Sequence, residues 1–161
     1  QDYMRFNVAT TFTRAAEEAI IDVASSIHVG ARGPTNDGGV FNHTRDVGYG
    51  LIDGTELFNN GLRNTAKKII NTLEGRSVYL CFDMDFFDPS CAPGVCTPTW
   101  GGATSREGLE FLQSLAGLNI VGADINTVSP PHDSSGMTAF LAATVGLEIL
   151  SLICYSKKLI K

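Results

Sequence analysis

The sequence feature that most constrains the fold is a continuous apolar run at residues 78–82, which ends abruptly at acidic residues. A strand that lacks polar alternation is typical of a parallel sheet covered on both faces. Further short apolar runs, at 26–32 and 119–123, also predict strands. Apolar residues at helical spacing separate these strands and predict helices at 11–23, at 54–74, from Ser105 onward and at 136–155.

The predicted order of helices and strands favours right-handed crossovers and therefore an α/β fold of three layers, αβα, around a parallel sheet. The Gly- and Asn-rich segment 33–46 is expected to be a loop, and the helix at 136–155 is expected to be a buried closing helix. With 161 residues and no visible linker or repeat, the chain 1–161 is expected to form a single domain.

Charge and hydropathy exclude several classes of partner. The chain has 12 Lys and Arg against 17 Asp and Glu, a net charge of -5, so we expect no binding to nucleic acid or to an anionic membrane. No apolar run is expected to reach the roughly 18 residues of a membrane span, and no signal-peptide pattern is visible, which favours the cytoplasm. The cysteines lack C-x-x-C spacing, so reduced thiols are expected.

The acidic residues after the run at 78–82 are the first candidates for chemistry. If the strand continued through them, alternation would place Asp83 and Asp85 on one face, at a Cα separation of roughly 6 to 7 Å. Two carboxylates held so close repel each other unless a proton or a cation lies between them, and hard oxygen ligands suit magnesium, calcium or manganese. The alternative is a solvated or helix-capping acidic loop. Asp88, before Pro89, is interpreted as a loop-forming residue.

The residues that follow give this acidic segment a more specific meaning. The pattern F-D-x-D-x-x-D-P at 82–89 is followed by A-P-G at 92–94, T-P at 97–98 and G-G at 101–102. This pattern resembles the signature of the ureohydrolase (arginase/agmatinase) family. The resemblance implies an arginase-like fold, two divalent metal ions, manganese most often with nickel as an alternative, and a homo-oligomer. It also implies that Asp83 bridges the two ions and that Asp85 binds one of them.

A second segment resembles the closing motif of the same family. Ser129-Pro130-Pro131 is followed by Asp133 and by Thr138-Ala139, in the family's order. Thr127 stands where these enzymes usually place a glutamate that pairs with the substrate guanidinium. Asn126, Thr127 and His132 are therefore the candidate substrate-binding residues, and neutral hydrogen bonds would suit guanidine or a guanidino acid. The alternative is that this loop merely packs.

Other positions depart from the family. Val8 stands where the family has a histidine implicated in catalysis, and the upstream G-G-D-H and D-A-H-x-D motifs, which supply the other metal ligands, do not occur. His28 lies in an apolar run and is interpreted as a core residue. Trp100 is expected either to line the pocket or to pack.

The sequence therefore predicts part of an arginase-like fold, the carboxyl-terminal half of a ureohydrolase. The complete enzyme would hydrolyse a C–N bond of a small guanidino substrate and release urea, although this chain alone lacks a full metal site. Two other interpretations stay open. One is a non-catalytic ureohydrolase-like partner subunit, and the other is a magnesium-dependent phosphoryl-transfer domain.

Overall fold

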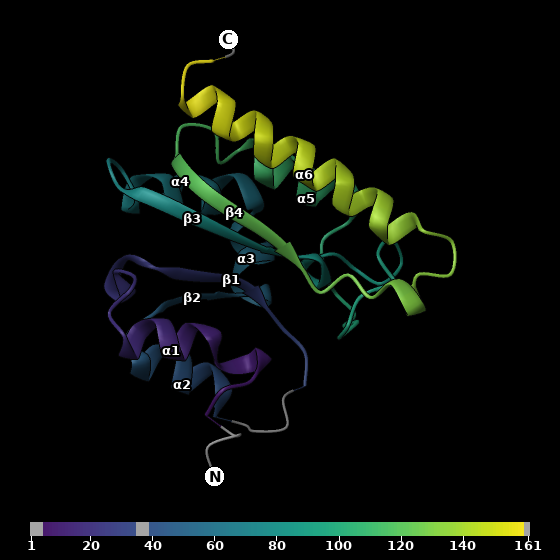
Figure 1. Cartoon of the computed structure of the whole chain (residues 1–161), viewed down its shortest axis with the longest axis horizontal. Coiled ribbons are helices and arrows are strands. Elements are labelled where there is room, and N and C mark those ends of the chain that lie inside the picture. Colours follow the sequence, from purple (N-terminus) through teal and green to yellow (C-terminus); the bar gives the residue numbers. More distant parts are fainter. Residues whose placement is uncertain (1–4, 35–38, 160–161) are drawn as a thin grey trace. The chain divides into compact units, whose positions relative to one another are not determined.

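The structure is a computed structural model that describes residues 5–34 and 39–159 (Figure 1). It divides into two compact units, Gln1–Asp53 and Gly54–Lys161, and each unit is considered by itself. The single domain expected over residues 1–161 stays a prediction. In both units parallel strands alternate with helices, which confirms the α/β class.

The first unit contains a parallel pair of strands, β1 (Ile27–Ala31) and β2 (Gly50–Asp53), with α1 (Thr11–Glu17) and α2 (Val40–Val47). Helix α1 is shorter than the predicted helix over 11–23, because Ala19 adopts a left-handed φ of 51° that stops it.

The predicted loop over residues 33–46 is wrong from position 40 onward, where α2 begins, and strand β2 was not predicted at all. Residues 35–38 of that loop lie outside the described residues. Phe41, Thr44 and Val47 are partly buried, whereas the polar residues between them are exposed. This spacing of three is helical, but so short and polar a segment becomes a helix only because β2 gives it a surface to pack on. Gly48 ends the helix at a left-handed φ of 109°.

An aromatic cluster holds α1 to the strands. The ring of His28 packs edge-on against Phe12 and Tyr49, with centroid distances of 5.4 and 4.9 Å, and the Tyr49 hydroxyl donates to the Phe12 carbonyl at 2.7 Å. Burial lowers the pKa of His28, which favours its neutral form. His28 is therefore a partly buried packing residue, which agrees with its interpretation as a residue of the apolar interior.

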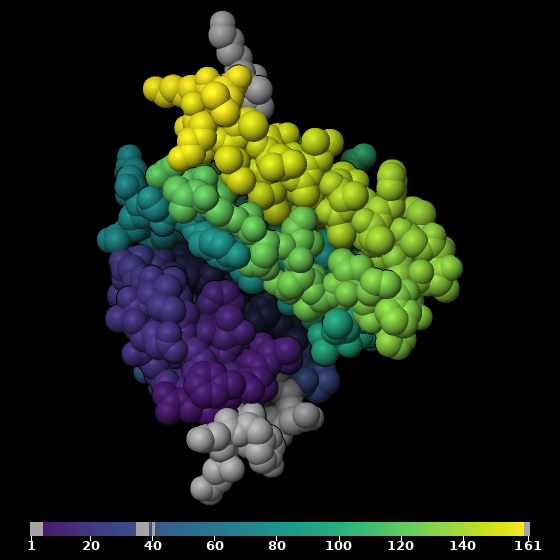
Figure 2. Space-filling view, viewed as in Figure 1, coloured from purple at the N-terminus to yellow at the C-terminus, as the bar shows by residue number. Residues whose placement is uncertain are grey.

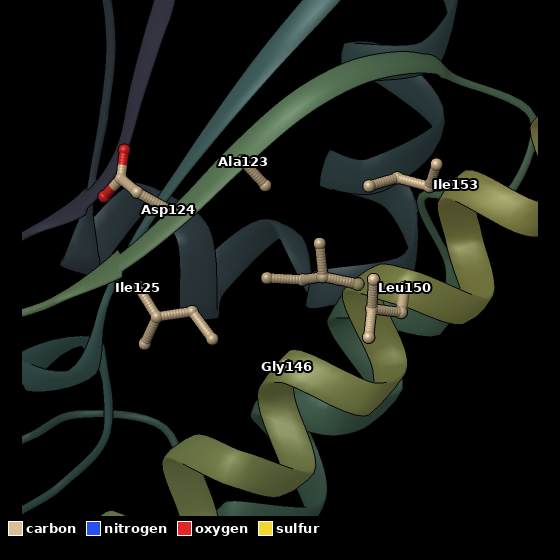
Figure 3. Close-up of a pocket in the computed structure, with 7 residues that line it drawn as sticks. Ala123, Asp124, Ile125, Gly146, Leu150 and Ile153 are labelled. Atoms are coloured by element: carbon tan, nitrogen blue, oxygen red, sulfur yellow. The ribbon is translucent and has the colours of Figure 1, made fainter.

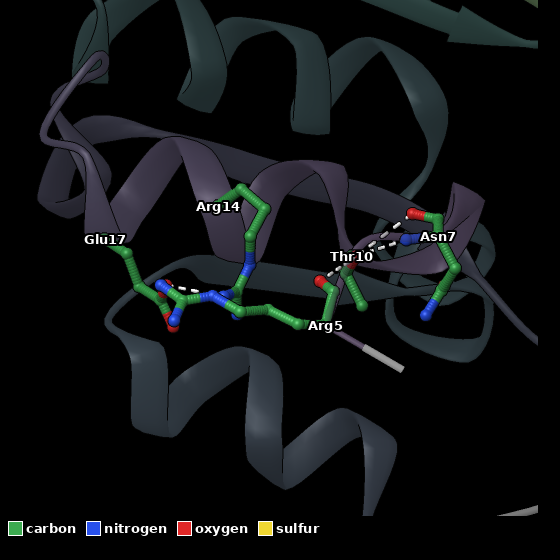
Figure 4. A network of polar contacts seen from close by, with 5 residues as sticks. All are labelled: Arg5, Asn7, Thr10, Arg14 and Glu17. Carbon is green, nitrogen blue, oxygen red and sulfur yellow. Dashed lines mark hydrogen bonds and ion pairs between the residues drawn. The ribbon is translucent and has the colours of Figure 1, made fainter. Parts of the chain in front are cut away.

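Before α1, a network of polar contacts fixes the chain (Figure 4). Asn7 caps a short 3-10 helix, Val8–Thr10, and Arg5 and Arg14 both pair with Glu17, at 3.0 and 2.6 Å. Val8, which stands where the family has a histidine, is 99% exposed, so its apolar side chain is not packed within this unit.

The second unit is built on β3 (Ser77–Asp83) and β4 (Asn119–Asn126), which pair in parallel through the crossover helix α5 (Ser105–Gln113) (Figure 1). The predicted helix over 54–74 is divided into α3 (Gly54–Asn60) and α4 (Leu62–Thr72), because Gly61 lies at φ 79° between them. Leu57, Phe82, Met84, Leu112 and Ile120 are among the buried core residues.

Strand β4 is longer than the predicted strand at 119–123, because it continues through Asp124 and Asn126. They belong to β4 itself, where Asp124 is in register with Cys81 and Asn126 with Asp83. Asp and Asn are poor strand formers, and the strand continues through them because the partner strand is already in place.

Helix α6 (Met137–Ser156) follows β4 and packs on β4 and α5. The prediction that it is a buried helix is wrong for its outer face. Thr138, Val145, Ile149 and Leu152 are buried, but Phe140, Leu147 and Leu150 are more than half exposed, and α6 forms a ridge of yellow and yellow-green atoms in Figure 2.

Among the described residues, α6 is the helix that is long and apolar enough to cross a membrane, by length and composition only. The expectation that no stretch of the chain reaches this size is therefore corrected. The absence of a membrane partner stays a prediction.

Candidate metal and substrate site

Three of the predicted site residues, Asp83, Asp85 and Thr127, meet at the carboxyl ends of β3 and β4. Asp83 and Asn126 are the last residues of their strands and lie in register with each other. The Thr127 hydroxyl donates a hydrogen bond to the Asp83 carboxylate, and the backbone N–H of Asp85 donates to the same carboxylate oxygen at 2.9 Å. The structure thus brings Asp83, Asp85 and Thr127 together.

The position of Asp85 has a different cause from the one expected. Strand β3 ends at Asp83, so alternation along a strand does not place the second carboxylate. Asp83 instead caps a 3-10 turn, Met84–Phe86, and the fully buried Met84 anchors that turn in the core. A short helical turn that begins at Asp83 therefore keeps the two carboxylates near each other.

The pKa of Asp83 is raised to about 6. Burial is the main cause and the charge of Asp85 adds to it, whereas the hydrogen bonds from Thr127 and from the Asp85 N–H oppose the shift. The Asp85 carboxylate also has a hydroxyl partner, because Thr97 donates to its Oδ2. Thr97 was not predicted as a site residue, although the T-P step that contains it was part of the recognised pattern.

The rest of the loop after β3 is held by Asp88. Its carboxylate accepts the backbone N–H groups of Ser90 at 2.9 Å, Gly101 at 2.9 Å and Gly102 at 3.2 Å. Hydrogen bonds from Ser90 in particular lower the pKa of Asp88 to about 2. The interpretation of Asp88 as a loop-forming residue is confirmed. Trp100, in the same loop, is 76% exposed, so it contributes little packing within this unit.

Asn126 faces the sheet rather than the loop. Its amide donates to Asp124 Oδ1 at 2.9 Å and to Cys81 Sγ at 3.1 Å, and the Cys81 thiol donates to Asp124 at 3.4 Å. Burial raises the pKa of Cys81 to about 11, which keeps it a neutral thiol. This polar cluster under the strand ends was not predicted, because its members come from two strands and touch only after pairing.

His132, the remaining predicted substrate residue, lies in a short 3-10 helix, Pro130–His132, and is exposed. Its Nδ1 pairs with the Ser129 hydroxyl at 2.7 Å. The contacts of His132 are thus within its own loop, and its role toward a substrate stays a prediction.

A cavity of about 300 Å³ lies elsewhere in this unit, between β4 and α6 (Figure 3). Its lining is mainly aliphatic, from Ile125, Ile149, Leu150 and Ile153, and the Asp124 carboxylate points away from these side chains. A cavity with no convergent polar groups offers nothing to orient a guanidinium, so the strand ends are the better candidate site.

The donor set at the strand ends fits part of a metal centre. Asp83 and Asp85 supply carboxylate oxygens, as manganese prefers. Within residues 5–34 and 39–159, however, no group of three or more His, Cys, Asp or Glu side chains is placed to hold a metal ion.

The chain is similar to known proteins over most of its length. The sequence model of the Arginase family matches residues 1–151. An agmatinase from Photorhabdus laumondii is 36% identical over 154 residues, 96% of this chain and 48% of the relative. A guanidinobutyrase from Pseudomonas aeruginosa is 34% identical over 144 residues, 89% of this chain and 45% of the relative.

The solved structures give the same result. The proclavaminate amidino hydrolase of Streptomyces clavuligerus superposes with a TM-score of 0.88 at 34% identity, covering 94% of this chain and 50% of that one. The arginase of Bacillus caldovelox superposes with a TM-score of 0.72 at 31% identity, covering 83% of this chain and 44% of that one.

The chain belongs to the arginase family, whose hydrolases act on C–N bonds. Its fold is the three-layer α/β fold of that family, as the sequence predicted. The chain spans about half the length of the relatives it matches. Family membership removes the phosphoryl-transfer alternative, and the alternative of a non-catalytic partner subunit finds no support among relatives that are named as enzymes.

Proposed function

We propose that the complete protein hydrolyses a small guanidino compound and releases urea in a metal-dependent reaction. The observation that carries the proposal is the pairing of Asp83 with Asp85 at the end of β3, inside the family's D-x-D, A-P-G and T-P pattern. The relatives named for hydrolysis of agmatine and guanidinobutyrate support the same class of substrate.

Asp83 and Asp85 are proposed to supply ligands to two divalent ions, manganese first and nickel second, with Asp83 shared between them. When bound, such ions activate water for attack on a C–N carbon. The remaining ligands are proposed to come from outside the described residues. Thr97 and Thr127 hold the oxygens of the two carboxylates and so orient them toward the ions. Asp83 requires this help because burial disfavours its charged form.

The substrate is proposed to be compact, such as guanidine or a guanidino acid, rather than arginine or agmatine. Thr127 offers a hydroxyl where a glutamate charge is usual, and a neutral group discriminates by directional hydrogen bonds. Asn126 and His132 are the further candidates for contact with the substrate. The cytoplasm and a homo-oligomeric state remain predictions from the sequence.

The test is urea release by the complete protein, purified with manganese or nickel, measured for guanidine, guanidino acids, agmatine and arginine. Asp83→Asn should reduce turnover at least about 100-fold while the protein stays folded, because an amide is a poor bridge between cations. Asp46→Asn, at an exposed position of α2, is the matched control and should retain turnover.

Undiminished turnover of Asp83→Asn at matched metal content would remove Asp83 from the metal site. A clear preference for arginine would defeat the compact-substrate proposal while leaving the reaction class intact.

A further inference from the structure

The two loops that carry the site are joined to each other by backbone hydrogen bonds. Val95 and Val128 form an isolated antiparallel bridge. Beside it, the Cys96 N–H donates to the Thr127 carbonyl at 2.9 Å, and the Ser129 N–H donates to the Gly94 carbonyl at 2.8 Å. The backbone at Thr127 is therefore bonded to the segment 94–96. We call the paired segments 94–96 and 127–129 the inter-loop ribbon.

Thr127 needs to be held in place. Its φ of 64° lies in the left-handed region, which β-branched residues strongly disfavour. Strain of this kind persists only where the surroundings over-determine the conformation. The inter-loop ribbon provides that constraint, and the Thr127 hydroxyl reaches Asp83 in this conformation.

Gly94 connects the ribbon to the start of α6. Its N–H donates to the Thr138 hydroxyl oxygen at 2.9 Å, and Thr138 is fully buried. At the start of α6, the Asp133 carboxylate accepts the N–H groups of Thr138 at 3.2 Å and of Ala139 at 2.8 Å. One chain of hydrogen bonds thus runs from the first turn of α6 to the ribbon.

The approach of Gly94 to this network is closer than any side chain permits. A Cβ at position 94 would overlap with Cβ and Cα of Asp133. The glycine therefore allows the ribbon to pack directly against the segment before α6. Among the described residues, the hydrogen-bond acceptor of the Gly94 N–H is the buried Thr138 hydroxyl.

We propose that Thr138 is a positioning residue, which acts through Gly94 and the inter-loop ribbon to hold the Thr127 hydroxyl on Asp83. The consequence for turnover rests on the proposed function, whereas the consequence for the ribbon does not. Thr138 itself lies in α6, and its hydrogen bonds within the described residues go to Gly94 and Asp133, not to the proposed metal or substrate groups.

The experiment compares Thr138→Val, Thr138→Ser and the matched control Thr144→Val in the full protein. Valine keeps the shape of threonine but removes the acceptor for Gly94, and serine restores it. Thr144 lies in the same helix, and its hydroxyl donates to the Phe140 carbonyl of its own helix. Amide hydrogen exchange at Cys96 and Ser129 reports on the ribbon without any need for activity.

With Thr138→Val, exchange at the Cys96 and Ser129 amides should accelerate about 10-fold or more, since a buried hydrogen bond is lost. Thr138→Ser and Thr144→Val should leave it close to the original rate. In the active protein, Thr138→Val should lower kcat about 10-fold with little change in KM, and serine should restore most of it.

Unchanged exchange at Cys96 and Ser129 in Thr138→Val would overturn the proposal, as would equal acceleration at all slow amides. Absence of urea release by the unmodified protein would count against the proposed function alone, because the exchange experiment would still report on Thr138.

Discussion

The loop after β3 and the loop after β4 meet at one site but are built in different ways. The loop after β3 is organised largely by its own carboxylates, because Asp83 caps the turn at Asp85 and Asp88 accepts N–H groups from Ser90, Gly101 and Gly102. The loop after β4 is held mainly from outside, by the segment 94–96 and by the start of α6.

This difference separates two ways of positioning a side chain. Bonds within a loop form whenever that short segment adopts its turn, so a sequence motif is enough to encode them. Bonds to a distant segment require both partners to be in place, and they allow a conformation such as that of Thr127, which a local preference would reject.

The largest effect on stability is expected where the loop after β4 packs closely against Gly94. Gly94→Ala should lower the free energy of unfolding by about 1 to 3 kcal/mol, because the added methyl group overlaps with Asp133 and has no flexible neighbour to displace. The measurement is denaturant unfolding. Gly101→Ala is the control: it has open space but a φ of 80°, so it should cost only about 1 kcal/mol. Equal costs for the two variants would show that the close approach is not what matters.

The strain at Thr127 gives the next effect. Thr127→Val and Thr127→Gly both remove the hydroxyl, but only glycine relieves the left-handed backbone, so Thr127→Gly should be more stable than Thr127→Val by about 1 kcal/mol. At Thr144, inside α6, the same pair should not favour glycine, since glycine weakens a helix interior. If the Thr127→Val variant were as stable as the Thr127→Gly variant, the left-handed backbone at position 127 would not be strained.

Asp133 tests the connection of the second loop to α6. Asp133→Ala removes an acceptor for the N–H groups of Thr138 and Ala139, and its melting temperature should fall by roughly 2 to 4 °C, as expected for loss of a helix cap. Ser134→Ala, at the exposed neighbouring position, should change it little. A melting temperature for Asp133→Ala that matches the Ser134 variant would mean that the cap is not used.

The smallest effect concerns the first loop and its pH dependence. The pKa of Asp88 in the folded protein is about 2, below its ordinary 3.8, so the charged carboxylate stabilises the fold above pH 4 and this contribution is lost as the pH falls from about 4 to about 2. Asp88→Asn should be slightly less stable at pH 7, and the gap should narrow in unfolding measurements at pH 3. A gap of constant size would exclude the carboxylate charge as its cause.

Much of the first loop and of the framework could be predicted from sequence. The apolar run before Asp83 identified β3, the D-x-D, A-P-G and T-P pattern identified the family, and Asp88 was recognised as a loop residue. These signals are short-range, because strand periodicity, glycine and proline act on the backbone of the residues that carry them.

The elements that could not be predicted depend on packing partners that lie outside the element itself. Helix α2 has a weak helical signal and packs on β2, and β4 continues through Asp124 and Asn126 because Cys81 and Asp83 pair with them. The outer face of α6 was misread because an apolar helix looks the same in sequence whether or not a neighbour covers it.

The sequence by itself determined that this chain has parallel strands with carboxylates at their ends, and that it belongs among the ureohydrolases. Only the tertiary structure decided that the Thr127 hydroxyl turns onto Asp83, that Asn126 turns toward Asp124 and Cys81, and that Thr138 reaches Gly94. The reason is that residue type sets what a group can donate or accept, whereas long-range backbone pairing sets which partner it meets.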